Sequence, residues 1–274
     1  MAGTAPRVSL VIPCFNEEES VDELVAEALH SRPDILMTRG GPMTAAARRA
    51  TRTVPIVMWG VTDPVGVGLV ASLPRPGGNV TGLSDDQDPA VVGKHLQLLK
   101  DVAPTISRVA IITRVEPSAT VPPVKSYEDA FTAAARTLTL QVRWWYVAGN
   151  DDIAKAFGEL AREGADALDV AHTPVTWMHR RQIMDLAARH RRPAIYWHRG
   201  YVLDGGLMSY GEDEREAPRR LAEYVDRILR GTRPADLPVE QPTKLELLLN
   251  LKTAETLGLT IPQSVLLRAD QVIR

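Results

Sequence analysis

The sequence predicts an α/β protein built from two doubly wound lobes. Short runs rich in apolar and β-branched residues alternate with helical stretches along most of the 274 residues, as expected for successive βαβ units. Most of the predicted strands are continuous apolar runs, which is typical of parallel strands covered on both faces. A break at 101–108 separates one βα series from a second, so we expect two lobes rather than a single sheet.

The elements follow from local patterns. Helices are predicted at 20–30, 44–52, 153–163 and 218–230. Ser20 and Glu23 have the spacing of a capping box at the start of the first helix, and Pro218 and Gly231 bracket the last. Nine segments are predicted as strands: 8–13, 34–38, 54–60, 79–84, 108–114, 141–147, 165–171, 193–198 and 205–211.

Composition narrows the class of partner. Lys plus Arg number 32 and Asp plus Glu number 34, giving a net charge of -2, which argues against nucleic acid as a partner. With the single cysteine Cys14, no intrachain disulfide can form. The longest apolar runs are too short to span a bilayer, and no signal peptide is visible, so we expect a chain that is cytoplasmic or that lacks its export signal.

The opening stretch VSLVIPCFNEEES, residues 8–20, suggests an enzyme instead. Nucleotide-sugar glycosyltransferases begin in a similar way, and they hold the nucleotide through a metal bound by carboxylates that follow a strand. The candidate carboxylates here lie in SDDQD (84–88) and NDD (150–152). Both precede predicted helices, and Asn150 or Asp151 is better explained as a helix cap. A glycosyltransferase therefore stays as the alternative hypothesis.

Longer phrases point to another family. They are DPVGVGLVASLPRPGGNVTGLS (63–84), GGLMSYG (205–211), the segment 224–262 and LLRADQVI (266–273). Together they resemble the substrate-binding proteins of bacterial ABC importers, related to those for aromatic and other amino acids. The resemblance runs from about Val21 to the C-terminus.

The resemblance implies a type I periplasmic binding protein: two Rossmann-like lobes, joined by a hinge, that close on a small amino-acid-like or aromatic solute. It implies no enzymatic activity, no cofactor, a periplasmic or extracytoplasmic location, and ABC permease subunits at the membrane as partners. The three crossings between lobes are expected near Pro104, 205–211 and 235–242. The first lobe would then comprise 1–104 and 206–236, and the second 105–205 and 237–274.

Ligands of such sheets bind beyond the carboxyl ends of the strands, which selects loops in both expected lobes. In the first lobe, Gly40 and Gly41 would let backbone N–H groups reach a ligand carboxylate, with Met43 beside them; an ordinary turn capped by Thr44 is an equal alternative. Asp63 would meet a ligand ammonium group or, alternatively, fix the turn at Pro64. The ligand-binding candidates are Gly40, Gly41, Met43, Thr44, Asp63, Thr113, Thr173, Tyr196 and Tyr201.

Aromatic and histidine residues in the second lobe complete the candidates. Trp177, Trp197 and Tyr201 would stack on an apolar ligand or, alternatively, pack at a lobe edge. His172 and His198 are not accompanied by a carboxylate or cysteine cluster in the sequence, so no metal site is expected. A nucleophile–base–acid trio is not apparent at any legible spacing, so no catalytic residues are expected.

The first lobe departs from the family pattern because only twenty residues precede the region of resemblance. If VSLVIPCF fills the slot of the second strand, the first strand is missing and the sheet would have a central gap. If it fills the first slot, a helix and a strand are missing. The first lobe is therefore expected to be shortened, with a homodimer as one way of covering exposed strand edges.

Overall fold

The computed structural model describes residues 6–11, 18–85, 89–114, 125–241 and 244–274. They form two compact α/β units. The first unit contains β1–β4, α1, α2, α9 and two short 3-10 helices, and the second contains the remaining elements. The residues of the glycosyltransferase-like opening from Ile12 to Glu17 lie outside the described ranges, as do Asp86 and Asp88 of the segment 84–88.

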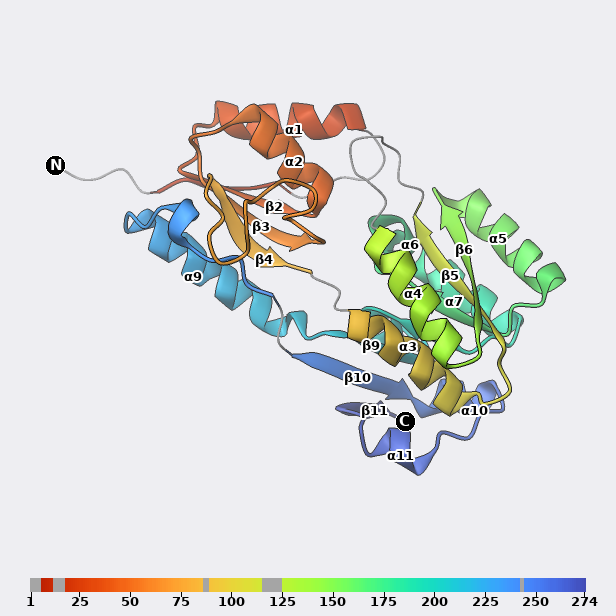
Figure 1. The fold of residues 1–274 in the computed structure, drawn as a ribbon. Helices are drawn as coiled ribbons and strands as arrows, with labels where there is room; N and C mark the ends of the chain where they lie inside the picture. The colour runs from red at the N-terminus through yellow and green to blue at the C-terminus, as the bar shows by residue number, and fades with distance from the viewer. Residues whose placement is uncertain (1–5, 12–17, 86–88, 115–124, 242–243) are drawn as a thin grey trace. The chain divides into compact units, whose positions relative to one another are not determined.

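The first unit is a parallel sheet in the order β1-β2-β3-β4. Its strands are β1 (Val8–Val11), β2 (Ile35–Arg39), β3 (Ile56–Val61) and β4 (Val80–Ser84). Its helices are α1 (Glu18–His30), α2 (Gly41–Ala50) and α9 (Ala217–Leu229), with 3-10 turns at Glu214–Glu216 and Pro234–Asp236. Figure 1 shows α1 and α2 over one face of this sheet and α9 over the other.

Strand alternation explains why both faces of the first sheet are covered. Leu36 and Met58 pack on one side in a core with Met43, whereas Ile35 and Val57 pack on the other side against the apolar stripe of α9. This two-sided burial confirms the predicted doubly wound class. The β1 strand pairs directly with β2, so the hypothesis of a central gap is wrong for the described residues.

The second unit is a seven-stranded sheet in the order β11-β10-β9-β8-β7-β5-β6. Its strands are β5 (Arg108–Arg114), β6 (Gln141–Val147), β7 (Ala167–Val170), β8 (Ala194–Tyr196), β9 (Met208–Glu212), β10 (Leu245–Asn250) and β11 (Gln271–Ile273). Its helices are α3 (Pro89–Val102), α4 (Lys125–Thr137), α5 (Asn150–Glu163), α6 (Pro174–Met178), α7 (Arg180–Arg189), α8 (Arg199–Leu203), α10 (Leu251–Thr256) and α11 (Gln263–Leu266). All neighbouring strands are parallel except β9 and β10, which are antiparallel.

The boundaries between units differ from the expected ones. The α3 helix and β9 belong to the second unit, whereas both were expected in the first. The reason is packing: Leu96 and Leu99 of α3 share a buried core with Val109 and Ile111 of β5. The first two changes of unit therefore fall near 86 and 213 rather than near Pro104 and within 205–211.

Two predicted caps are wrong. The α1 helix begins at Glu18, which places Ser20 inside the helix instead of at its cap. In α5, Gly149 occupies the cap position without a side-chain hydrogen bond, and Asn150 and Asp151 lie in the first turn. None of the helices in the described ranges has the length and apolar character that crossing a bilayer requires.

Candidate functional site

In the first unit, the turn after β2 brings backbone N–H groups to the carboxyl edge of the sheet. Gly40 is the N-cap residue of α2 with φ 82° and ψ 160°, and no side chain caps this helix. A Cβ atom at Gly40 or Gly41 would meet nothing within 4 Å, so conformation rather than crowding requires glycine at Gly40. The Gly40 N–H donates to the Trp59 carbonyl over 2.8 Å and Pro42 has no N–H, which leaves the Gly41 N–H at this turn to bind an anion.

Two predicted contact residues of this turn serve the fold. The Thr44 hydroxyl donates to the Gly40 carbonyl over 2.8 Å and lies 2.8 Å from the Thr38 hydroxyl. Thr44 is inside α2, so it is not the cap that the alternative interpretation expected. Met43 is only 1% exposed and belongs to the core of the first unit. Both side chains therefore fix the shape of the turn from beneath.

Asp63 holds the next turn along the same edge. It follows β3, has φ 45°, and its Oδ1 accepts a hydrogen bond from the Gly66 N–H over 2.8 Å. A Cβ atom at Gly66 would lie 2.0 Å from the other carboxylate oxygen, so this glycine is required by close approach. The structural alternative for Asp63, the fixing of the Pro64 turn, is thus present in the structure.

Sequence reasoning missed a charged and aromatic group beside these turns. The Arg39 guanidinium at the end of β2 lies 4.2 Å from the ring centroid of Trp59 on β3, and its Nη2 is 3.4 Å from a Glu214 carboxylate oxygen. A cation over an indole face is attracted by the ring quadrupole. An arginine and a tryptophan at the ends of otherwise apolar strand runs were the signal in the sequence.

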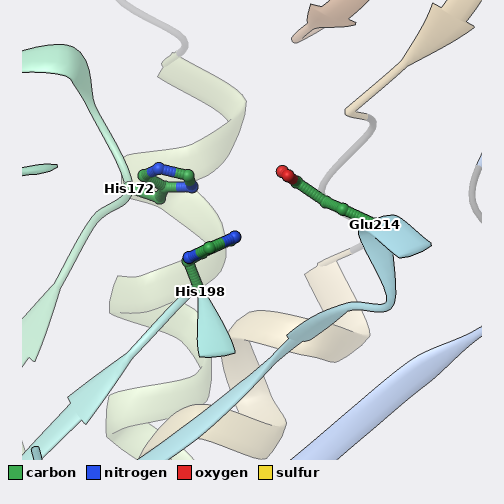
Figure 2. Close-up of side chains that lie close together, drawn as sticks. All are labelled: His172, His198 and Glu214. Atoms are coloured by element: carbon green, nitrogen blue, oxygen red, sulfur yellow. The ribbon is translucent and has the colours of Figure 1, made fainter. Parts of the chain in front are cut away.

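In the second unit, four aromatic side chains cluster where β7 and β8 end. We call this cluster the aromatic platform: His172, Trp177, His198 and Tyr201. The rings of His172 and His198 lie 4.5 Å apart between centroids, and Figure 2 shows them side by side on neighbouring segments. Trp177 meets the rings of His198 and Tyr201 edge-to-face, at 4.9 and 5.5 Å. The platform lies at the strand ends where ligands of parallel sheets bind.

A backbone hydrogen bond orients the ring of His198, one of the two platform histidines. His198 caps α8, and its Nδ1 accepts a hydrogen bond from the Gly200 N–H over 3.1 Å. Because Nδ1 uses its lone pair in this bond, the neutral ring carries its proton on Nε2, and a cation would have to displace that proton.

The remaining predicted residues of the second unit differ in exposure. Thr173 is the N-cap of α6 and forms a capping box with Thr176, in which each hydroxyl accepts the other residue's N–H. Thr113 is half-buried near the end of β5, beside β7. Trp197 is not part of the platform: it is buried, and its indole N–H donates to Asp169 over 2.7 Å.

Tyr196 and Tyr201 stack on each other inside the core, with ring centroids 4.6 Å apart. Burial raises the pKa of both phenols, so both stay neutral in the physiological range. The Tyr201 hydroxyl makes no hydrogen bond of normal geometry with any described residue, although Thr176 is close enough to lower its pKa in part. Tyr196 therefore supports the platform from below, and the Tyr201 ring forms its floor.

Two doubly wound α/β units, each with ligand-type loops at the carboxyl ends of its parallel strands, define the class of the type I periplasmic binding proteins. A model of the family described as ABC transporter substrate binding protein matches residues 15–273. The chain belongs to this family.

Relatives agree with this assignment. A tyrosine-binding protein of Clostridioides difficile (strain R20291) is 26% identical over 250 residues, which cover 89% of this chain and 68% of that protein. The structure of an ABC domain in complex with L-Trp from Streptococcus pneumoniae is 26% identical, with a TM-score of 0.84, and the match covers 94% of this chain and 84% of that one. A conserved domain protein from Vibrio cholerae is 28% identical, with a TM-score of 0.84, covering 93% and 84%.

Proposed function

We propose that this protein binds an aromatic amino acid, of the tyrosine or tryptophan type, and delivers it to an ABC importer on the extracytoplasmic side of the membrane. The observation that carries the proposal is the aromatic platform at the carboxyl ends of β7 and β8. Relatives that are described as binding tyrosine or bound to L-Trp support the same ligand class. Binding without covalent change is the activity that the family implies.

The platform would receive the ligand ring. Trp177 presents an indole, and aromatic pairs gain about 0.5–1.5 kcal/mol beyond the area that they bury. The half-buried Thr113 and Thr173 would supply polar contacts at the rim. Tyr196 and Tyr201 would act mainly by holding the platform in place, because both rings are buried.

The first unit would receive the amino-acid end of the ligand. The Gly41 N–H suits a carboxylate, since the start of a helix favours negative charge, whereas the Gly40 N–H donates to the Trp59 carbonyl over 2.8 Å and would act by shaping the turn. Asp63 would meet the ammonium group with Oδ2, because Oδ1 is engaged by Gly66. Met43 and Thr44 would shape this turn from the core side.

We propose hinge closure as the mechanism. Within the described ranges the chain passes between the two units three times, and a ligand that contacts both would stabilise a closed conformation over an open one. The closed form would be the one that the permease recognises. This mechanism needs no metal and no cofactor.

A thermal-shift panel of single amino acids tests the ligand class. The proposal predicts that L-Trp and L-Tyr raise the melting temperature by several degrees at about a hundred times their dissociation constants, which corresponds to about 2.7 kcal/mol. L-Arg, L-Glu and L-Leu should leave it unchanged. Stabilisation by a sugar nucleotide with a divalent cation, and not by aromatic amino acids, would overturn the proposal in favour of a glycosyltransferase.

A further inference from the structure

A buried polar network lies in the second unit, on the side of the sheet that packs against α3, whereas the platform packs with the core on the other side. Asp169 on β7 and His95 on α3 are both fully buried, and the His95 Nδ1 lies 3.0 Å from Asp169 Oδ2. The other carboxylate oxygen accepts the Trp197 indole N–H over 2.7 Å. The His95 ring also stacks on Trp197, with centroids 4.0 Å apart. One aspartate thus connects a helix, its own strand and the end of β8.

Each hydrogen-bond donor in this network has an acceptor. The His95 Nε2 lies 2.5 Å from the Tyr210 carbonyl oxygen on β9, and a carbonyl only accepts, so Nε2 must carry a proton. A second proton must lie between His95 Nδ1 and Asp169 Oδ2. The Trp197 N–H can only donate. Removing the carboxylate would leave two buried groups unsatisfied, which costs more than the net value of the bonds themselves.

Two residues of the network lie close to the platform histidines along the chain. Asp169 lies three residues before His172, and Trp197 immediately precedes His198. The strands that carry them are neighbours, because Asp169 pairs with Ile195 and Val170 pairs with Tyr196. A hydrogen bond between Asp169 and Trp197 therefore fixes the distance between the two chain segments from which the platform histidines project.

We propose that Asp169 is a positioning residue of the platform, which holds His172 and His198 in register through Trp197 and His95 without contacting the ligand. The effect of Asp169 on ligand affinity rests on the function proposed above. Its effect on the histidine rings is independent of any ligand.

Two substitutions of similar size separate the hydrogen bonds of Asp169 from its volume. In Asp169→Asn, the amide oxygen still accepts from Trp197, and the amide nitrogen can donate to His95 Nδ1 while Nε2–H still donates to Tyr210. In Asp169→Leu, both neighbours lose their partner. We expect Asp169→Asn to bind L-Trp within about threefold of the native protein, and Asp169→Leu to bind at least tenfold more weakly, since a tenfold change corresponds to about 1.4 kcal/mol.

Asp166→Leu is the matched control for general loss of stability. Asp166 immediately precedes β7, at the opposite end from the platform, and its Oδ2 accepts from the N–H groups of Ser107 and Arg108. This variant should lower the melting temperature yet leave affinity unchanged. Where Asp169→Leu does not fold, Trp197→Phe is the replacement, because it removes only the indole donor to Asp169 and most of the ring remains.

NMR of the histidine rings gives a readout that needs no ligand. In the ligand-free protein, the His172 and His198 resonances should shift in Asp169→Leu or Trp197→Phe and stay in place in Asp169→Asn and Asp166→Leu. Unshifted rings in a folded Asp169→Leu variant, or equal damage from Asp169→Asn, would overturn the positioning role. If the native protein binds no aromatic amino acid but the rings shift as expected, the proposed function fails and the positioning role stands.

Discussion

The carboxylate of Asp166 orders the backbone at the start of β5. Asp166 gathers the N–H groups of Ser107 and Arg108 and the Ser107 hydroxyl at the start of β5. Burial alone would raise the pKa of Asp166, but these hydrogen bonds and the nearby Arg108 charge outweigh it and hold the pKa below its ordinary value. The charged form is therefore favoured in the folded state.

The lowered pKa of Asp166 makes its contribution to folding stability depend on pH. Because the folded-state pKa of Asp166 is lowered, its contribution to stability is full above about pH 4 and is lost as the pH falls further. We expect Asp166→Asn to lower the free energy of unfolding by about 1–2 kcal/mol at pH 7 and by much less at pH 3. Urea unfolding at both pH values measures this. The exposed Glu159→Gln is the control, and an equal loss at pH 3 would contradict the account.

The pairing of Asp169 with His95 could not be predicted from the sequence. Asp169 and His95 are 74 residues apart, and no local pattern pairs them. An aspartate inside the apolar run 165–171 was a visible signal that a buried partner exists, but it does not name that partner. Glycine turns were easier to predict, because Gly40 requires a backbone conformation that other residues rarely adopt.

At the scale of elements, amphipathic helices and apolar strands were predictable, whereas β10 was not. Its sequence, LELLLN, is made largely of good helix formers, and local propensity does not predict a strand. Antiparallel pairing with β9 decides the outcome. Glu246 within it is accommodated by an ion pair with Arg199 at 2.6 Å, which is a tertiary contact.

The α9 helix offers the clearest test at this scale. The structure buries Leu221, Tyr224 and Ile228 of this helix. We expect Leu221→Ala to cost about 2–4 kcal/mol in free energy of unfolding, because it opens a cavity beneath the helix. Leu229→Ala, at a position that is 41% exposed, should cost less than about 1 kcal/mol. Equal effects in chemical denaturation would mean that α9 does not pack through this stripe.

At the scale of the whole molecule, the two-unit architecture was predictable and its boundaries were not. Alternating strands and helices indicate βαβ units wherever they occur. Which unit a helix joins depends on the core that its apolar face meets, as α3 shows by packing with β5. The proposed function was predicted from the family resemblance and not from local sequence patterns. Platform residues such as His172 and His198 come together only through the pairing of β7 with β8.

Hinge closure predicts a change in overall dimensions. Saturating L-Trp should reduce the radius of gyration in small-angle X-ray scattering, because the closed form is more compact than the open one. L-Arg at the same concentration is the control and should leave the scattering unchanged. If L-Trp binds by calorimetry and the radius of gyration stays constant, binding does not proceed by closure.

Isothermal titration calorimetry of L-Trp with Trp177→Ala tests the central claim most directly. The native protein should bind L-Trp, and loss of the platform indole should weaken binding at least tenfold, about 1.4 kcal/mol. Tyr146→Ala, which removes an exposed aromatic ring from the edge strand β6, should bind as the native protein does. An undiminished affinity in a folded Trp177→Ala variant would contradict the assignment of the aromatic platform as the ligand site.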